Sequence, residues 1–104
     1  MIEGCAHVSV GTSDTLVYSG NPEKKKYIRL IILTNTTGSA ITVTLKDKYT
    51  DINGTAAERT ITKVIVPANS TTVINNVVGF RFNGELYAVA DATGCEISVG
   101  VEEK

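Results

Sequence analysis

The residues with the most chemical potential are two cysteines and a single histidine. Cys5 and His7 are two positions apart, so in an extended strand their side chains point to the same side. A thiol beside an imidazole can act as a nucleophile or bind part of a metal site. A structural zinc ion needs four ligands, however, and Cys95 is the only other thiol. We therefore predict no catalytic residue, no bound cofactor and no metal site, with Cys5 and His7 being ordinary strand residues.

A second group of polar residues occupies the segment 47–58, which contains Asp47, Asp51 and Asn53 followed by Gly54. The spacing does not fit a calcium loop, because aligning Gly54 with the loop glycine places Tyr49 where the first carboxylate should be. A weak cation contact by the two aspartates stays open, but turn formation explains them better. We expect an exposed, irregular loop here.

The composition of the chain argues against several classes of partner and against catalysis. Ten basic and eleven acidic residues give a net charge of -1, which predicts no general binding to nucleic acid. The longest apolar run, 30–33, is too short to cross a membrane, so we expect no membrane partner. A serine or cysteine nucleophile normally needs a neighbouring general base, and the chain has one histidine that could serve. We therefore predict that the protein is not an enzyme.

Short runs rich in valine, isoleucine and threonine alternate with glycine, asparagine and aspartate clusters along the whole chain. This pattern predicts one all-β domain over residues 1–104, a two-sheet antiparallel sandwich of the jelly-roll or immunoglobulin-like kind with about eight strands. The expected strands are 6–10, 15–18, 26–35, 40–46, 59–66, 70–74, 85–90 and 96–101. The stretch 77–82 carries Phe80 and Phe82, which we expect to close one end of the core.

The strand expected at 26–35 is apolar on both sides. Simple alternation places Ile28, Leu30 and Ile32 on one face and Ile31 and Leu33 on the other. Such a strand belongs in the centre of a sheet, with its second face covered by loops or by another copy of the protein. The expected interaction surface therefore includes Ile31 and Leu33, together with Tyr49, Asp51, Asn53 and Tyr87.

Two short connections are expected to close antiparallel hairpins. One is 36–39, between the strands at 26–35 and 40–46, and the other is 91–94, between the last two strands. Alternation also separates the cysteines: Cys5 points away from Val8 and Val10, whereas Cys95 shares a face with Ile97. We therefore expect no disulfide between Cys5 and Cys95.

Several segments resemble small β-sandwich proteins encoded among bacteriophage and prophage structural genes. They are ILTNTTGSAITVTLKD at 32–47, VPANSTTVI at 66–74, GELYAVA at 84–90 and GCEISVGV at 94–101. The resemblance implies a virion structural or accessory protein of a head, neck or tail. It implies contacts with copies of itself and with other virion proteins, and residence in the host cytoplasm and then in the virion.

The first residues lack a basic start followed by an apolar stretch, which predicts no signal peptide. An alternative function stays open: a monomeric sandwich that binds carbohydrate or protein through the loop expected at 47–58 and through Tyr49 and Tyr87.

Overall fold

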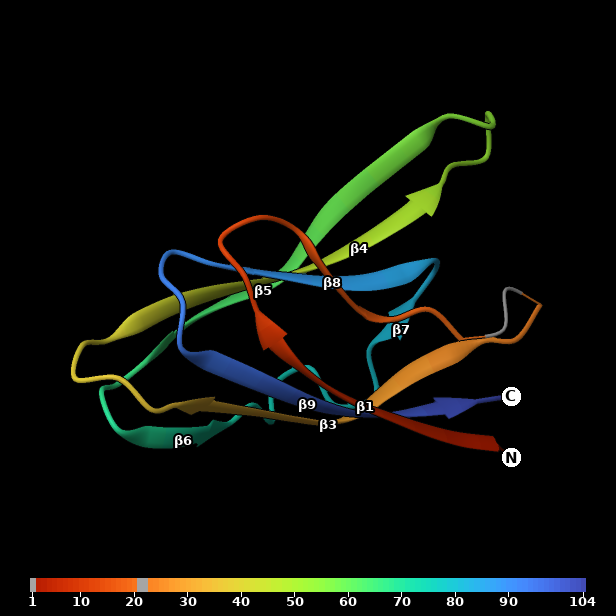
Figure 1. Cartoon of the computed structure of the whole chain (residues 1–104). Helices are drawn as coiled ribbons and strands as arrows, with labels where there is room; N and C mark the ends of the chain where they lie inside the picture. The colour runs from red at the N-terminus through yellow and green to blue at the C-terminus, as the bar shows by residue number, and fades with distance from the viewer. Residues whose placement is uncertain (1, 21–22) are drawn as a thin grey trace.

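A computed structural model describes residues 2–20 and 23–104, and within them the fold is all β, with no helix. None of the described residues forms a helix long and apolar enough to cross a membrane. Figure 1 shows two layers of strands. The strands are β1 (Ile2–Val10), β2 (Thr15–Tyr18), β3 (Lys26–Asn35), β4 (Ile41–Thr50), β5 (Ala56–Val66), β6 (Ser70–Val73), β7 (Arg81–Phe82), β8 (Glu85–Ala90) and β9 (Cys95–Glu103).

The strand order is that of a jelly roll. One sheet, here called sheet A, has the order β1-β9-β3-β6, with β7 paired to the start of β3. The other, sheet B, has the order β2-β8-β4-β5. The chain passes several times from one sheet to the other, as in a jelly roll. The first strand, β1, and the last, β9, are antiparallel neighbours in sheet A. The predicted two-sheet antiparallel sandwich is confirmed, and its order distinguishes the jelly roll from the immunoglobulin arrangement.

The core lies between the two sheets and is built by the alternating residues of each strand. Along β4 every odd position from Ile41 to Asp47 is buried, and the even positions face outward. Phe82 is buried at one end, where its ring lies perpendicular to that of Tyr18 with 6.2 Å between the centroids. Phe80 is half-buried against the same core. The predicted aromatic closure therefore depends mainly on Phe82.

Both predicted hairpins are wrong. The segment 36–40, which contains the predicted turn 36–39, leads from β3 in sheet A to β4 in sheet B, and 91–94 leads from β8 in sheet B to β9 in sheet A. A connection of four or five residues is long enough either to reverse a strand or to cross between packed sheets about 10 Å apart. Asn35 fixes the first crossing: its buried amide donates hydrogen bonds to the carbonyls of Ser39 at 2.7 Å and Val66 at 3.1 Å.

The predicted faces of β3 are also wrong after its third residue. A bulge at Arg29 breaks the register, because Ile28 pairs with Val101 and Leu30 with Gly100. The extra residue moves Ile31 and Leu33 into the core, where their exposed fractions are 0% and 1%. Ile31 and Leu33 therefore contribute no surface for interaction. Leu30, 43% exposed, lies on the outer face in their place.

The segment 47–58 is not an irregular loop. β4 continues to Thr50 and β5 begins at Ala56, so only five residues form the turn between them. The partner strand β8 reaches only as far as Lys48, where it pairs through Glu85. The hairpin beyond this point, residues 49–57, extends past the body of the sandwich and is called the arm below; Figure 1 shows it in yellow-green.

Candidate functional site

The tip of the arm is a tight turn organised by Asp51. Its carboxylate accepts hydrogen bonds from the backbone N–H groups of Asn53 at 2.9 Å and Thr55 at 3.0 Å. Gly54 has a positive φ of 80°, a conformation that glycine adopts without strain. Because Asp51 is used by its own turn, the tip exposes Asn53 and the fully exposed side chain of Ile52. The expected turn role of Asp51 is confirmed.

The two tyrosines of the predicted surface do not come together. Tyr49 shares the inner face of β4 with Asp47, whereas Tyr87 lies opposite Lys46 on the outer face of sheet B. Each ring also faces a cation: the guanidinium of Arg59 lies 5.8 Å from the Tyr49 centroid, and Lys48 Nζ lies 4.5 Å from that of Tyr87. Both residues are half-buried and lie on opposite faces of sheet B, so they do not form one joint aromatic surface.

Asp47 is a buried carboxylate at the base of the arm. Its side chain is 0% exposed and forms an ion pair with Arg59 at 3.2 Å. It also accepts the backbone N–H groups of Asn83 at 2.9 Å and Gly84 at 3.0 Å, which anchor the turn between β7 and β8. The alternation of β4, which places Asp47 on the same face as Leu45, could have revealed this burial. Asp47, which we expected in an exposed loop, is instead buried and holds β5 and the turn between β7 and β8 against β4.

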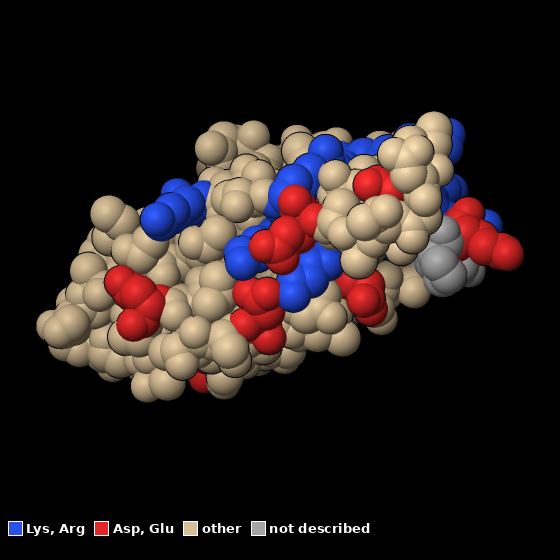
Figure 2. Space-filling model, turned by 90° about the horizontal axis from the view of Figure 1, so that it is seen from above, with Lys and Arg blue, Asp and Glu red and all other residues tan. Residues whose placement is uncertain are grey.

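A charged cluster covers the outer face of sheet B beside it. Lys48 lies 2.6 Å from Asp14, Lys46 lies 3.3 Å from the same carboxylate, and both lysines approach Glu58 within 3.9 Å. Hydrogen bonds from Lys48 and then Lys46 lower the pKa of Asp14, and Asp14 raises the pKa of Lys48. Figure 2 shows the alternating red and blue side chains of this face.

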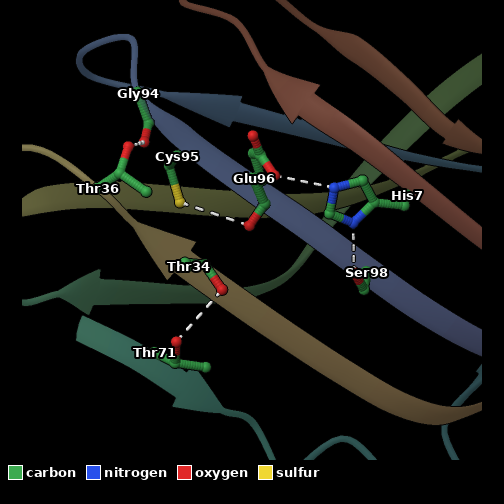
Figure 3. A network of polar contacts seen from close by, with 8 residues as sticks. All are labelled: His7, Thr34, Thr36, Thr71, Gly94, Cys95, Glu96 and Ser98. Atoms are coloured by element: carbon green, nitrogen blue, oxygen red, sulfur yellow. Dashed lines mark hydrogen bonds and ion pairs between the residues drawn. The ribbon is translucent and has the colours of Figure 1, made fainter. Parts of the chain in front are cut away.

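The outer face of sheet A carries a different polar group, drawn in Figure 3. His7 on β1 lies between two residues of β9: its Nδ1 is 2.5 Å from Ser98 Oγ, and its Nε2 is 2.9 Å from Glu96 Oε1. A serine, a histidine and an acid in one chain of hydrogen bonds are the side chains of a hydrolytic triad. Sequence reasoning missed this group because the register of β1 on β9 creates it.

The surroundings of this triad do not favour acyl transfer. His7 and Glu96 are 60% and 47% exposed, so water competes for every hydrogen bond. Ser98 belongs to β9, which pairs with β1 on one side and β3 on the other. The backbone N–H groups of such a strand bond to its neighbours and are not free to stabilise an oxyanion. The group can hold strands together and offer polar contacts, but it lacks the setting of an active site.

Beside His7 the outer face of sheet A is apolar. Gly100 has no side chain, and the space above it forms a groove of about 360 Å³ lined by Cys5, Ala6, His7, Leu30, Ser98, Val99 and Gly100. The thiol of Cys5 is free and exposed on this face. Further along the same sheet, Val73 adds a side chain that is 49% exposed. This face therefore combines exposed apolar side chains with an accessible thiol.

The predicted separation of the cysteines is confirmed. Cys5 is exposed on the outer face, where it pairs with Gly100, while Cys95 is buried in the core and pairs with Val10. Burial, followed by the nearby charge of Glu96, raises the pKa of the Cys95 thiol. Among the described residues, no group of three or more histidine, cysteine or acidic side chains could hold a metal ion. Cys5 is thus the one accessible thiol of the described chain.

No known protein family matches this sequence, and no curated protein matches it either. Solved structures do share the fold. One comes from work titled "Bacillus endospore appendages form a novel family of disulfide-linked pili"; it is 15% identical, with a TM-score of 0.57, over 96% of this chain and 82% of its own. Another, the crystal structure of PirA, is 13% identical with a TM-score of 0.58, over 98% and 93%. At these identities the likeness establishes the fold alone.

Proposed function

We propose that the protein is a non-enzymatic structural subunit that assembles with copies of itself. The observation that carries the proposal is the outer face of sheet A, where Leu30, Val73 and the groove above Gly100 leave apolar surface uncovered beside the Cys5 thiol. Apolar surface of this kind on a small domain is typical of protein contacts. The likeness in fold to a protein described as forming disulfide-linked pili supports the same conclusion.

The number of accessible thiols limits how a disulfide could contribute. A single exposed cysteine per chain can join two copies and no more, because each disulfide consumes one thiol from each partner. Cys95 cannot supply a second link without opening the core, since it is buried. An assembly larger than two copies therefore needs contacts that are not covalent, and Cys5 would reinforce one of them.

The test is the molecular mass of the purified chain across a wide concentration range, measured by light scattering with and without a thiol reductant. We expect assemblies larger than a monomer in both conditions. Replacing Cys5 by serine should remove only the part that the reductant also removes. A strict monomer at the highest concentration, in oxidising and reducing buffer alike, would contradict the proposal.

A finer assignment, to the head, neck or tail of a bacteriophage, remains a prediction from the sequence resemblance. Neither of the two structural neighbours is described as a phage protein, and one of them belongs to Bacillus endospore appendages. Genes for capsid, portal or tail proteins beside this one would favour the virion and association with other virion proteins. Genes for appendage assembly would favour a cell-surface or spore-surface fibre.

A further inference from the structure

The last strand of sheet B is long and open. β5 runs over eleven residues, Ala56–Val66, and pairs only with β4. Half of the backbone N–H and C=O groups of an edge strand point outward, and no described strand lies beyond β5 to receive them. At the end of the strand, the carbonyl of Val66 accepts a hydrogen bond from the side-chain amide of Asn35.

The other three edges are less open. The edge strands β2 and β6 have four residues each. β1 has nine residues, two fewer than β5. Short and covered edges are the ordinary protection against pairing with another chain. β5 is the longest of the four edge strands, and it exposes 67% of Ile65.

A bulge in β5 places an acidic and a basic side chain on the same face of the strand, so that two antiparallel copies of β5 can pair them. Glu58 and Lys63 are five residues apart and would point to opposite faces of a regular strand. β4 pairs Lys46 with Thr60 and Leu45 with Thr62, so Ile61 is an extra residue in β5. Because of this extra residue, each side chain after Ile61 points to the face opposite to the one that simple alternation predicts. Glu58 lies opposite Lys48 and Lys63 opposite Thr44, and both therefore share the outer face.

We propose that two copies of the chain join by antiparallel pairing of β5 with β5, with Glu58 of each copy opposite Lys63 of the other. In this register a two-fold axis passes between Thr60 and Ile61, so the opposite-charge pair occurs twice. The same alignment places Ala56 opposite Ile65 of the second copy on the outer face. Registers that place Lys63 against Lys63 oppose like charges, which destabilises paired strands.

Both charges are available for this contact. The side chain of Glu58 is 52% exposed, and its distances of 3.7 and 3.9 Å to Lys46 and Lys48 are long for ion pairs. Lys63 is exposed and forms no ion pair within the described residues. The result is a single eight-stranded sheet made from two four-stranded ones. This contact rests on the proposed function, because it names one surface through which copies assemble, and it is distinct from the face that carries Cys5.

The test uses two charge reversals, Lys63→Glu and Glu58→Lys, on a Cys5→Ser background that removes disulfides. Each variant alone places like charges together twice, so we expect its self-association to weaken about tenfold or more relative to the parent. Mixing the two variants restores both pairs with opposite charges, and the mixture should associate at least as tightly as the parent. Sedimentation velocity of the two proteins, separately and mixed, measures this.

Matched controls separate the contact from unfolding and from net charge. Lys24→Glu changes the charge by the same amount on an exposed turn and should leave association unchanged. Thermal unfolding of each variant confirms that it is folded. If the parent associates but the reversals do not weaken it, or the mixture does not recover, the β5 contact is wrong while the proposed function stands. A parent that is always monomeric refutes both.

Discussion

Three consecutive charged residues of β4 lie in two contrasting environments. Lys46 and Lys48 point outward to the exposed carboxylates of Asp14 and Glu58. Asp47 points inward, where it is fully buried and bonded to Arg59 and to the turn at Asn83 and Gly84. The two clusters contain similar groups at similar distances. They differ in how much water each group has lost, which decides what each contributes.

Burial makes the inner cluster indispensable and leaves the outer one adjustable. A carboxylate taken out of water needs every one of its partners, because removing one leaves a charge without compensation. An exposed ion pair replaces contacts with water by contacts of similar strength, and salt screens it. The inner cluster therefore fixes the base of the arm to the body, whereas the outer cluster can exchange partners, as the proposed pairing through Glu58 requires.

The largest effect is expected from Asp47→Ala. The change removes the carboxylate that pairs with Arg59 and accepts the backbone N–H groups of Asn83 and Gly84, so the free energy of unfolding should fall by about 3–5 kcal/mol. Chemical denaturation measures it, with Asp14→Ala as the matched change on the outer face. Equal losses in the two variants would mean that burial does not distinguish the clusters.

A smaller loss is expected from Gly84→Ala. A methyl group there would overlap the carbonyl oxygen of Lys48. Because this oxygen belongs to the backbone and cannot turn aside as a side chain can, the turn that binds Asp47 must move. We expect a loss of about 1–3 kcal/mol. Gly38→Ala is the control, since nothing lies within 4 Å of the added methyl group. The idea fails if the two glycine variants unfold at the same denaturant concentration.

Stability at alkaline pH tests the burial of Tyr18, whose ring packs against Phe82 next to the turn at Asn83 and Gly84. Burial first, and then a hydrogen bond with Glu103, raises the pKa of Tyr18 to about 12 from the ordinary 10.0. Between these values the unfolded chain loses the phenol proton while the folded chain keeps it, so stability should fall as pH rises through this range. Stability measured against pH for the wild type and for Tyr18→Phe isolates the effect, because the lysines titrate in both. Parallel curves would contradict it.

The smallest effect is expected from Asp14→Asn in the outer cluster. The lowered pKa of Asp14 means that its ionised form favours the folded chain, so its contribution is present above the ordinary pKa of 3.8 and is lost as pH falls below that value. Wild type and variant should differ slightly at neutral pH and low salt, and should converge in strong acid or at about 1 M salt. A difference that persists in high salt would show that Asp14 acts by more than charge.

The fold class and much of the local structure follow from the residue pattern alone. Three strands, β2, β3 and β8, begin and end where the residue pattern predicts, because β-branched runs and turn residues act over a few neighbouring positions. The opposite placement of Cys5 and Cys95 also follows from alternation within strands that contain no bulge between the residues compared. These are properties of short segments, and short segments were enough to predict them.

Which strands pair, and which faces they bury, depends on contacts between segments that are far apart in the chain. A connection such as 36–39 is compatible with a hairpin or with a crossing between sheets, and contacts between distant segments select the crossing. The bulges at Arg29 and Ile61 each shift the alternation by one residue, which buried Ile31 and Leu33 and placed Glu58 and Lys63 on one face. Asp47 is buried because Arg59, Asn83 and Gly84 meet it in space. Pairing energy is shared between strands far apart in the chain, so no single segment carries the information.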